Sequence, residues 1–266
     1  MRELLINAGI KPESISVDQK AGAFRVSVYW DDLPGARRAQ KTINASLKGA
    51  LRLRIRKIKN ENWKTKHAKN FSIFALTKSF DVVPSWKKKA YRKTARAPII
   101  LDSINAFGTG LHETTSFMAR LIEGRKGRFQ SFLDIGTGTG LLALIALKCG
   151  AQKVCAIDID EDAVVAARRN FKANQYPEDR VARKDIAHGR FTERFDFVAA
   201  NLITRDLVLF RKQILSTVAK GGVLALSGIM IENLSLVRKA FDGKQLRCLK
   251  ICKGQQWVAL LYQRIA

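Results

Sequence analysis

A glycine-rich turn between two apolar strands constrains the fold of this chain most strongly. Residues 132–158 read FLDIGTGTGLLALIALKCGAQKVCAID, and Gly136, Gly138 and Gly140 lie where the first strand meets a helix. Glycines at such a turn permit positive φ angles and let the backbone approach a ligand closely. Asp158 follows 22 residues after Gly136, at the end of the next strand, where a carboxylate can accept hydrogen bonds from two ribose hydroxyls. The segment therefore predicts a βαβ unit that binds a nucleotide.

The spacing of these glycines separates two classes of cofactor. Nicotinamide and flavin sites favour G-x-G-x-x-G, whereas here the third glycine comes one residue earlier and Leu141 takes the last position. G-x-G-x-G followed by a strand-terminal acid fits S-adenosylmethionine (SAM) better than a dinucleotide. The alternative is a glycine-rich turn in an ordinary α/β protein, and the spaced Asp158 argues against it.

Beyond residue 100 the chain alternates between strands and helices. The pattern predicts helices over 113–123, 139–149, 160–173, 205–219 and 231–241, and strands over 132–136, 153–158, 180–184, 195–200, 222–227, 246–252 and 256–262. Helices of this length between strands indicate a mainly parallel sheet covered on both faces. Only Lys253, Gly254 and Gln255 separate the last two strands, which must then form an antiparallel hairpin. The predicted fold class is α/β, with the Rossmann-like sheet and antiparallel terminal hairpin of class I SAM-dependent methyltransferases.

The first part of the chain predicts a small α+β domain. Residues 23–30 alternate between apolar and polar side chains, as a half-buried strand does. Residues 31–35 form a turn cluster, and a helix is expected over 36–47. Residues 51–58 alternate apolar and basic side chains, which predicts a second strand with a row of cations on its open face.

Positive charge is concentrated near the N-terminus. The whole chain has 48 Lys and Arg against 23 Asp and Glu, a formal net charge of +25. Residues 1–100 hold 23 basic and 7 acidic residues, a net charge of +16. Such a field attracts polyanions, so rRNA, or a protein embedded in RNA, is an expected partner, and a solvated basic face is the alternative. We expect a small α+β domain at 1–57 whose cationic face could dock a substrate, a connector at 58–100 and a SAM-dependent methyltransferase domain at 101–266.

Residues at the carboxyl ends of the strands are the candidates for chemistry, because ligands of such sheets bind there. Asn201 offers a carbonyl oxygen that can orient the lone pair of an amine toward a methyl group without carrying a charge; a helix cap is the alternative. Asp185 follows the third strand and is a candidate for contact with adenine, or else a surface acid. The loop from Phe107 to Thr115 precedes the first core strand and is placed to cover the methionine end of the cofactor. Within it, His112 alone would more often be a capping or structural histidine.

Other residue types exclude several functions. The four cysteines form no C-x-x-C pair, and the three histidines, His67, His112 and His188, form no cluster, so no metal site is expected. No cysteine lies in a strand-end motif, which argues against covalent cysteine catalysis. The N-terminus is too weakly apolar for a signal peptide, and the longest apolar run, 141–147, is far shorter than the ~20 residues of a membrane span. We expect a cytoplasmic protein with reduced thiols and no membrane partner.

The chain resembles the PrmA family, the methyltransferases of large-subunit ribosomal protein L11. The most specific segment is AFGTGLHETT at 106–115, which resembles the AFGTG-x-H-x-TT loop of that family. Segments 84–86, 134–140, 157–160, 200–202 and 226–228 also match it. By position, the family's cofactor-binding residues fall on Thr115, Gly136, Asp158 and Asn201. The resemblance implies SAM-dependent methylation of Lys ε-amines and an N-terminal α-amine of the ribosomal protein, with an N-terminal domain that recognises it.

Some positions depart from the family pattern. Asp102-Ser103-Ile104-Asn105 replaces the usual Asp-Pro-Gly before the AFGTG loop, Thr137 replaces a cysteine, and the alanine of Asn-Ile-Leu-Ala is missing after Asn201. The strong basicity is also unusual for the family. Two other functions therefore stand beside protein methylation: an RNA methyltransferase, and a non-catalytic factor with a SAM fold that binds RNA or the ribosome. The absence of a Pro-Pro-aromatic sequence after Asn201 argues against the first, and the intact glycines argue against the second.

Overall fold

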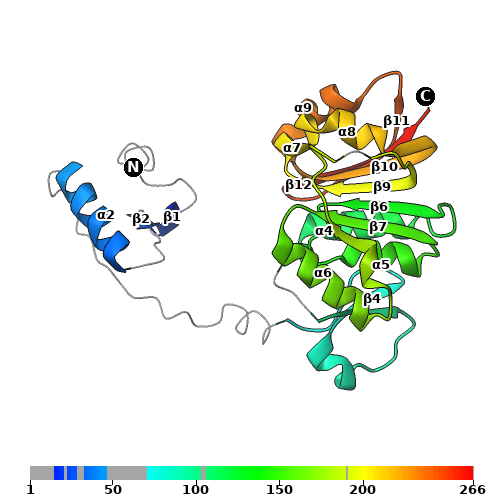
Figure 1. The fold of residues 1–266 in the computed structure, drawn as a ribbon, viewed down its shortest axis with the longest axis horizontal. Coiled ribbons are helices and arrows are strands. Elements are labelled where there is room, and N and C mark those ends of the chain that lie inside the picture. Colours follow the sequence, from blue (N-terminus) through cyan, green and yellow to red (C-terminus); the bar gives the residue numbers. More distant parts are fainter. Residues whose placement is uncertain are drawn as a thin grey trace. The chain divides into compact units, whose positions relative to one another are not determined.

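The computed structural model describes residues 15–20, 23–28, 33–46, 71–102, 106–189 and 191–265. The chain divides into two compact units, Met1–Trp63 and Lys64–Ala266. Figure 1 shows the elements of each unit.

The described part of the first unit is a hairpin followed by a helix. Strands β1 (Ile15–Lys20) and β2 (Ala23–Val28) pair antiparallel, and helix α2 (Leu33–Ser46) comes next. Strand β2 confirms most of the strand predicted at 23–30. The helix begins before residue 36 because Pro34, in its first turn, has no N–H to satisfy and a φ suited to a helix start. The cation-bearing strand predicted at 51–58 lies outside the described residues.

A small sheet in the second unit occupies much of the segment that the sequence predicted to be a connector. Its strands, in order, are β3 (Phe74–Ala75), β4 (Phe80–Pro84) and β5 (Ala97–Leu101), with the 3-10 helix η2 (Ser85–Ala90) between the last two. β3 and β4 pair antiparallel, whereas β4 and β5 pair in parallel. Val82 and Leu101 are fully buried in an apolar cluster that also contains Met118 and residues 141–147.

Seven strands form the main sheet, in the order β11-β12-β10-β9-β6-β7-β8. They are β6 (Ser131–Ile135), β7 (Lys153–Asp158), β8 (Val181–Arg183), β9 (Phe195–Asn201), β10 (Val218–Met230), β11 (Leu246–Lys253) and β12 (Trp257–Arg264). The strands from β10 to β8 pair in parallel, and β12 runs antiparallel to both β10 and β11. The predicted α/β sheet with an antiparallel terminal hairpin is confirmed. The order of the parallel strands reverses between β6 and β9, and such a switch point is where ligands bind in open α/β sheets.

Helices cover both faces of this sheet (Figure 1). One face packs against α4 (Glu113–Glu123), α5 (Leu141–Lys148) and α6 (Glu161–Ala173), and the other against α7 (Thr204–Leu209), α8 (Arg211–Ser216) and α9 (Leu234–Phe241). Two short 3-10 helices, η3 (Glu178–Arg180) and η4 (Ile231–Asn233), complete the described set. The single helix predicted at 205–219 is divided at Phe210, and the first turn of the one predicted at 231–241 is 3-10.

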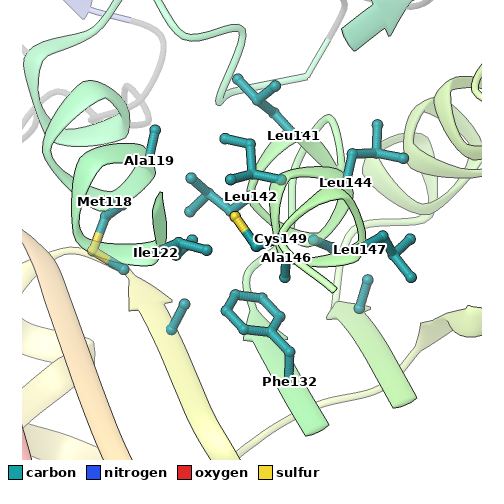
Figure 2. Packing of buried hydrophobic residues seen from close by; sticks show 14 of the residues in the cluster. Met118, Ala119, Ile122, Phe132, Leu141, Leu142, Leu144, Ala146, Leu147 and Cys149 are labelled. Carbon is teal, nitrogen blue, oxygen red and sulfur yellow. The ribbon is translucent and has the colours of Figure 1, made fainter. Parts of the chain in front are cut away.

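The core explains why these strands read as almost continuous apolar runs. Phe132 belongs to the cluster under α4, α5 and α6, whereas the next residue, Leu133, belongs to the cluster under α7, α8 and α9. Successive side chains of a strand point to opposite faces, and here both faces are buried. Figure 2 shows Phe132 beneath Ala146, with Ile122 of α4 beside them. Burying a phenylalanine of this kind contributes about 2–3 kcal/mol. No helix in the described ranges is long and apolar enough to cross a bilayer.

Candidate functional site

Three predicted site residues meet at the carboxyl edge of the main sheet. Ile135 of β6 pairs with Ile157 of β7 on one side and with Ala200 of β9 on the other. The next residues of these strands are Gly136, Asp158 and Asn201, so the register places all three at the same level on the switch-point edge. Sequence reasoning placed them at strand ends, and the parallel pairing brings them together.

The glycine turn holds the carboxylate of Asp158. The backbone N–H of Gly138 donates to Asp158 Oδ2 over 2.9 Å, and the N–H of Asp160 donates to Asp158 Oδ1 over 3.1 Å. All three glycines of the turn adopt the expected positive φ, between 54° and 79°. Each carboxylate oxygen keeps a lone pair after these bonds, because it can accept more than one hydrogen.

At two of these glycines, other residues of the protein occupy the space that a side chain would need. A Cβ at Gly138 would collide with the carbonyl oxygen of Phe107, and one at Gly136 would lie 2.5 Å from Leu202 Cδ2. The turn therefore accepts two neighbouring segments, the loop that contains Phe107 and the chain that leaves Asn201. The sequence interpretation gave this room to a ligand, but at these two positions it lets the elements of the site converge.

Thr139 fastens the AFGTGLHETT loop to the turn. Its N–H donates to the carbonyl oxygen of Phe107 over 2.9 Å, and its hydroxyl donates to that of Gly108 over 2.6 Å. Thr139 is fully buried, whereas the Phe107 side chain is 59% exposed. Sequence reasoning assigned no role to Thr139. Its position between Gly138 and Gly140 was the one feature of the sequence that could have indicated a role for it.

The start of α4 brings a group of polar side chains against Asn201. His112 is the N-cap of α4, and the buried Thr114 and Thr115 follow in its first turn. The Asn201 Nδ2 donates to Thr114 Oγ1 over 3.4 Å. The oxygen atoms Asn201 Oδ1 and Thr115 Oγ1 are buried without a hydrogen-bond partner in the part of the chain that the structure describes.

Asp134 is a buried acid directly beneath the turn. The hydroxyl of Thr137 donates to its Oδ2 over 2.7 Å, while its Oδ1 is the third buried side-chain atom without a partner among the described residues. Burial raises the pKa of Asp134 to about 7, and the negative charge of Asp158 adds to this rise. Sequence reasoning gave Asp134 no separate role, although an acid between Leu133 and Ile135 was a visible anomaly in an apolar strand.

Asp185 lies beside the site and is engaged in its own turn. The chain leaves β8 next to Asp158, because the N–H of Lys184 donates to the carbonyl oxygen of Asp158 over 2.9 Å. The Asp185 carboxylate accepts from the N–H of Ala187 over 2.7 Å and lies 2.8 Å from His188 Nδ1. The hydrogen bond with His188 lowers the pKa of Asp185, so it is ionised at neutral pH. Its contact with adenine stays a prediction.

The described ranges, 71–102, 106–189 and 191–265 together with the N-terminal elements, contain no group of His, Cys, Asp and Glu that could hold a metal ion. The polar groups gathered at the carboxyl edge are instead hydroxyl, amide and carboxyl oxygens. They suit an organic ligand that brings hydrogen-bond donors.

Comparison with known proteins identifies the family. The family model of the ribosomal protein L11 methyltransferase (PrmA) matches residues 7–265. The chain belongs to this family. The ribosomal protein L11 methyltransferase of Pelobacter propionicus is 33% identical over 217 residues, which cover 80% of this chain and 70% of that relative. That of Geobacter metallireducens is 35% identical over 208 residues, covering 77% and 67% respectively.

A solved structure agrees with this PrmA assignment. The ribosomal protein L11 methylase of Lactobacillus delbrueckii subsp. bulgaricus superposes with a TM-score of 0.66 at 26% identity, covering 74% of this chain and all of that one. The resemblance inferred from the AFGTGLHETT loop is thereby confirmed. The fold is that of the class I SAM-dependent methyltransferases, as the glycine spacing and the terminal hairpin predicted.

Proposed function

We propose that this PrmA family member transfers methyl groups from SAM to amino groups of ribosomal protein L11. The observation that supports the proposal most directly is the set of three buried oxygens without partners, on Thr115, Asp134 and Asn201. They are the only buried side-chain atoms of this kind among the described residues, and they lie on elements that converge at the switch-point edge. Buried polar atoms almost always have partners, so a site that leaves three unpaired is built for a ligand.

The chemistry of these residues fits SAM. The two oxygens of Asp158 can each accept from one ribose hydroxyl, and the loop that carries Phe107 and Thr115 is fastened over the glycine turn by Thr139. Thr115 Oγ1 can form a hydrogen bond with a polar group of the methionine moiety of SAM. We assign cofactor binding to Phe107, Thr115, Gly136, Gly138, Gly140, Asp158, Asp185 and Asn201.

SAM, when bound, supplies an electrophilic methyl group on its sulfonium. Asn201 Oδ1 accepts a hydrogen from the acceptor amine, and this bond directs the nitrogen lone pair toward the methyl group. Because the amide is neutral, it aligns the amine without stabilising the ammonium form as a carboxylate would. Holding two reactants in line is a large part of what a protein contributes to such a displacement.

We propose that exposed apolar side chains on the segments that carry the site residues favour a neutral amine. Phe107, Leu111 and Ile203 are 59%, 66% and 62% exposed, and Ile203 lies two residues beyond Asn201. An amine that enters between apolar side chains loses water, and this loss lowers its pKa because the charged form is disfavoured. The ammonium proton leaves to solvent before transfer. Lys ε-amines and an N-terminal α-amine both suit this environment, and we propose them as the acceptors.

The first unit is proposed to recognise the protein substrate. Its described part offers a hairpin and an amphipathic helix α2, which buries Ile43 and exposes Arg37 and Arg38. Residues 1–63 hold 13 Lys and Arg against 6 Asp and Glu, and this net charge of +7 suits a substrate that binds RNA in the ribosome, or direct contact with rRNA. We further propose that the protein acts in the cytoplasm, where ribosomes assemble.

Transfer of a labelled methyl group tests these proposals together. The protein is incubated with methyl-labelled SAM and, separately, with free L11, assembled large subunits or rRNA, and the labelled product is identified by mass spectrometry. We expect label on lysine and N-terminal amines of L11. Label on RNA would support the RNA methyltransferase instead. SAM binding without transfer to any acceptor would support a non-catalytic ribosome-associated factor. The Asp158→Ala variant controls for transfer that does not depend on the site.

A further inference from the structure

Asn201 is the end of a hydrogen-bonded series that begins at the N-cap of α4. His112 Nδ1 lies 2.7 Å from Thr114 Oγ1, and Thr114 Oγ1 accepts from Asn201 Nδ2 over 3.4 Å. Thr114 is 1% exposed, so water does not replace either partner. The series joins Thr114 to a residue 87 positions away in the sequence and ends at the Asn201 amide.

The helix cap fixes the direction of this series. The backbone N–H of Thr114 points at His112 Nδ1 over 3.4 Å and can only donate. Since an amide N–H can only donate, this contact favours the tautomer in which Nδ1 accepts and Nε2 carries the proton. The Thr114 hydroxyl, 2.7 Å away, then donates its only hydrogen to the single lone pair of Nδ1, which the N–H at 3.4 Å shares more weakly. Its oxygen is left as an acceptor, which selects Nδ2 rather than Oδ1 of Asn201 as its neighbour.

The orientation of the amide follows from these steps. If Nδ2 faces Thr114, the Oδ1 of Asn201 faces the other way, and this is the atom that the structure leaves buried and unpaired within its described residues. The opposite amide orientation would require Thr114 to donate to Oδ1. The Thr114 hydroxyl would then have no hydrogen left for His112 Nδ1. It would also occupy Asn201 Oδ1, the oxygen that the acceptor amine needs as its hydrogen-bond partner.

The C-terminal hairpin and the AFGTGLHETT loop hold His112 in place. Its ring packs edge-on against the rings of Trp257 and Phe107, with ring centroids 5.0 Å and 5.4 Å apart respectively. The neighbouring Glu113 accepts from the N–H of Gln255, in the turn between β11 and β12, over 3.2 Å. The antiparallel strands at the edge of the sheet thus contact the residue that sets the direction of the series.

We propose that His112 and Thr114 are positioning residues, which act through Asn201 by turning its carbonyl oxygen toward the acceptor amine. The inference rests on the proposed amine methylation, but the tautomer of His112 and the orientation of the amide exist without substrate. His112 and Thr114 contribute to turnover without touching the reacting atoms.

The tautomer of His112 gives a test that needs no activity. Long-range ¹H–¹⁵N spectra show which ring nitrogen carries the proton, and the chain has only three histidines, so the His112→Asn spectrum assigns the signal. At about pH 8.5, where histidine is ordinarily neutral, we expect the proton on Nε2. A proton on Nδ1 would overturn the proposal, whether or not the protein methylates L11. Failure of methylation with the expected tautomer would refute the proposed function alone.

Kinetics of matched variants test the effect on turnover. Thr114→Val keeps the buried shape and removes the hydroxyl, and we expect kcat to fall about tenfold with a change in KM of less than about threefold. Thr114→Ser should restore kcat. His112→Asn retains an oxygen that can accept from both groups of Thr114, so it should keep more activity than His112→Ala. The control is Thr217→Val, which removes a buried hydroxyl bonded to Ile214 at the other edge of the sheet and should leave kcat unchanged.

A double-mutant cycle separates positioning from a loss of folding. In the Asn201→Ala background the amide is gone, so Thr114→Val should have no further effect on kcat. An undiminished tenfold loss in that background would mean that Thr114 acts independently of Asn201. A Thr114→Val variant with the kcat of the unchanged protein would also contradict the proposal. Thermal unfolding of each variant shows whether any of these losses reflects a destabilised fold.

Discussion

Two aspartates at opposite ends of the parallel strands, Asp196 and Asp134, differ in the hydrogen bonds that their carboxyl groups accept. Near the amino end of β9, Asp196 Oδ2 accepts from the N–H groups of Gln130 and Ser131, both over 2.9 Å. Burial alone would raise the pKa of Asp196, but these bonds together lower it. Near the carboxyl end of β6, Asp134 is more deeply buried, and its Oδ1 has no hydrogen-bond partner among the described residues. Backbone N–H groups satisfy Asp196 at the amino edge, whereas Asp134, near the carboxyl edge, keeps an oxygen without a partner among the described residues.

Replacing an aspartate at each edge gives the largest expected contrast. We expect Asp158→Ala to weaken SAM binding by about 100-fold or more, because two hydrogen bonds to a charged group contribute about 1.5–3 kcal/mol each. Asp196→Ala should change the SAM dissociation constant by less than about threefold, while lowering the free energy of unfolding by about 1–2 kcal/mol. Calorimetric titration with SAM measures the first effect, and urea unfolding measures the second. Equal losses of affinity in both variants would remove the distinction between the edges.

The buried carboxyl of Asp134 should make stability depend on pH. Its folded pKa of about 7 lies above the unfolded value of about 4, so the folded state binds the proton more tightly. The penalty for burying the charge is absent below the unfolded pKa and complete above the folded one. Asp134→Asn removes this titration while keeping an acceptor for Thr137. Relative to the unchanged protein, we expect the variant to gain about 2–3 kcal/mol in unfolding free energy between about pH 5 and about pH 8. A pH-independent difference in urea unfolding would show that Asp134 is ionised throughout.

Replacing Asn201 separates the effect of the carboxyl edge on turnover from its effect on SAM binding. Asn201→Ala removes the oxygen that aligns the amine, and we expect kcat for L11 to fall about tenfold to hundredfold. The SAM dissociation constant should rise by a smaller factor than kcat falls, since Asp158 and the glycine turn remain. Steady-state kinetics and titration separate the two effects. Unchanged turnover would exclude Asn201 from the catalytic residues.

The smallest expected effect is a difference in stability between alanine substitutions at two glycines with positive φ. An alanine at Gly138 (φ 54°) would meet the Phe107 carbonyl, whereas at Gly150 (φ 103°), after α5, it would meet nothing within 4 Å. Both substitutions carry the backbone strain of about 1 kcal/mol. Because of the collision, we expect Gly138→Ala to lower the free energy of unfolding by about 1–2 kcal/mol more than Gly150→Ala. Equal losses in urea unfolding would show that the loop does not rest on the turn.

Much of the second unit was predictable because its signals are local. The apolar strands, the helices between them and the three-residue turn before β12 follow from short periods and turn lengths. They were confirmed, except that the helix predicted at 205–219 is divided at Phe210 and ends before β10. The small sheet of β3, β4 and β5 was not predictable, since a strand such as Phe74–Ala75 is too short to show a period. Its stability comes from partners distant in the sequence.

Some residues of the candidate site were indicated by the sequence, but their arrangement was not. Strand ends and the glycine spacing indicated Gly136, Asp158 and Asn201, and parallel register then placed them side by side. The bond from Asn201 to Thr114 spans 87 residues, and no spacing rule indicates it. The docking of Phe107 on Gly138 likewise depends on the packed structure, because only there is the room above that glycine filled.

A crystal structure with S-adenosylhomocysteine, the product of methyl transfer, tests the central claim most directly. We expect the ribose hydroxyls within hydrogen-bond distance of both Asp158 oxygens, and the amino acid part beside Thr115 with its sulfur facing the Asn201 oxygen. Density for the ligand elsewhere, or at this edge without contact to Asp158 and Asn201, would contradict the account.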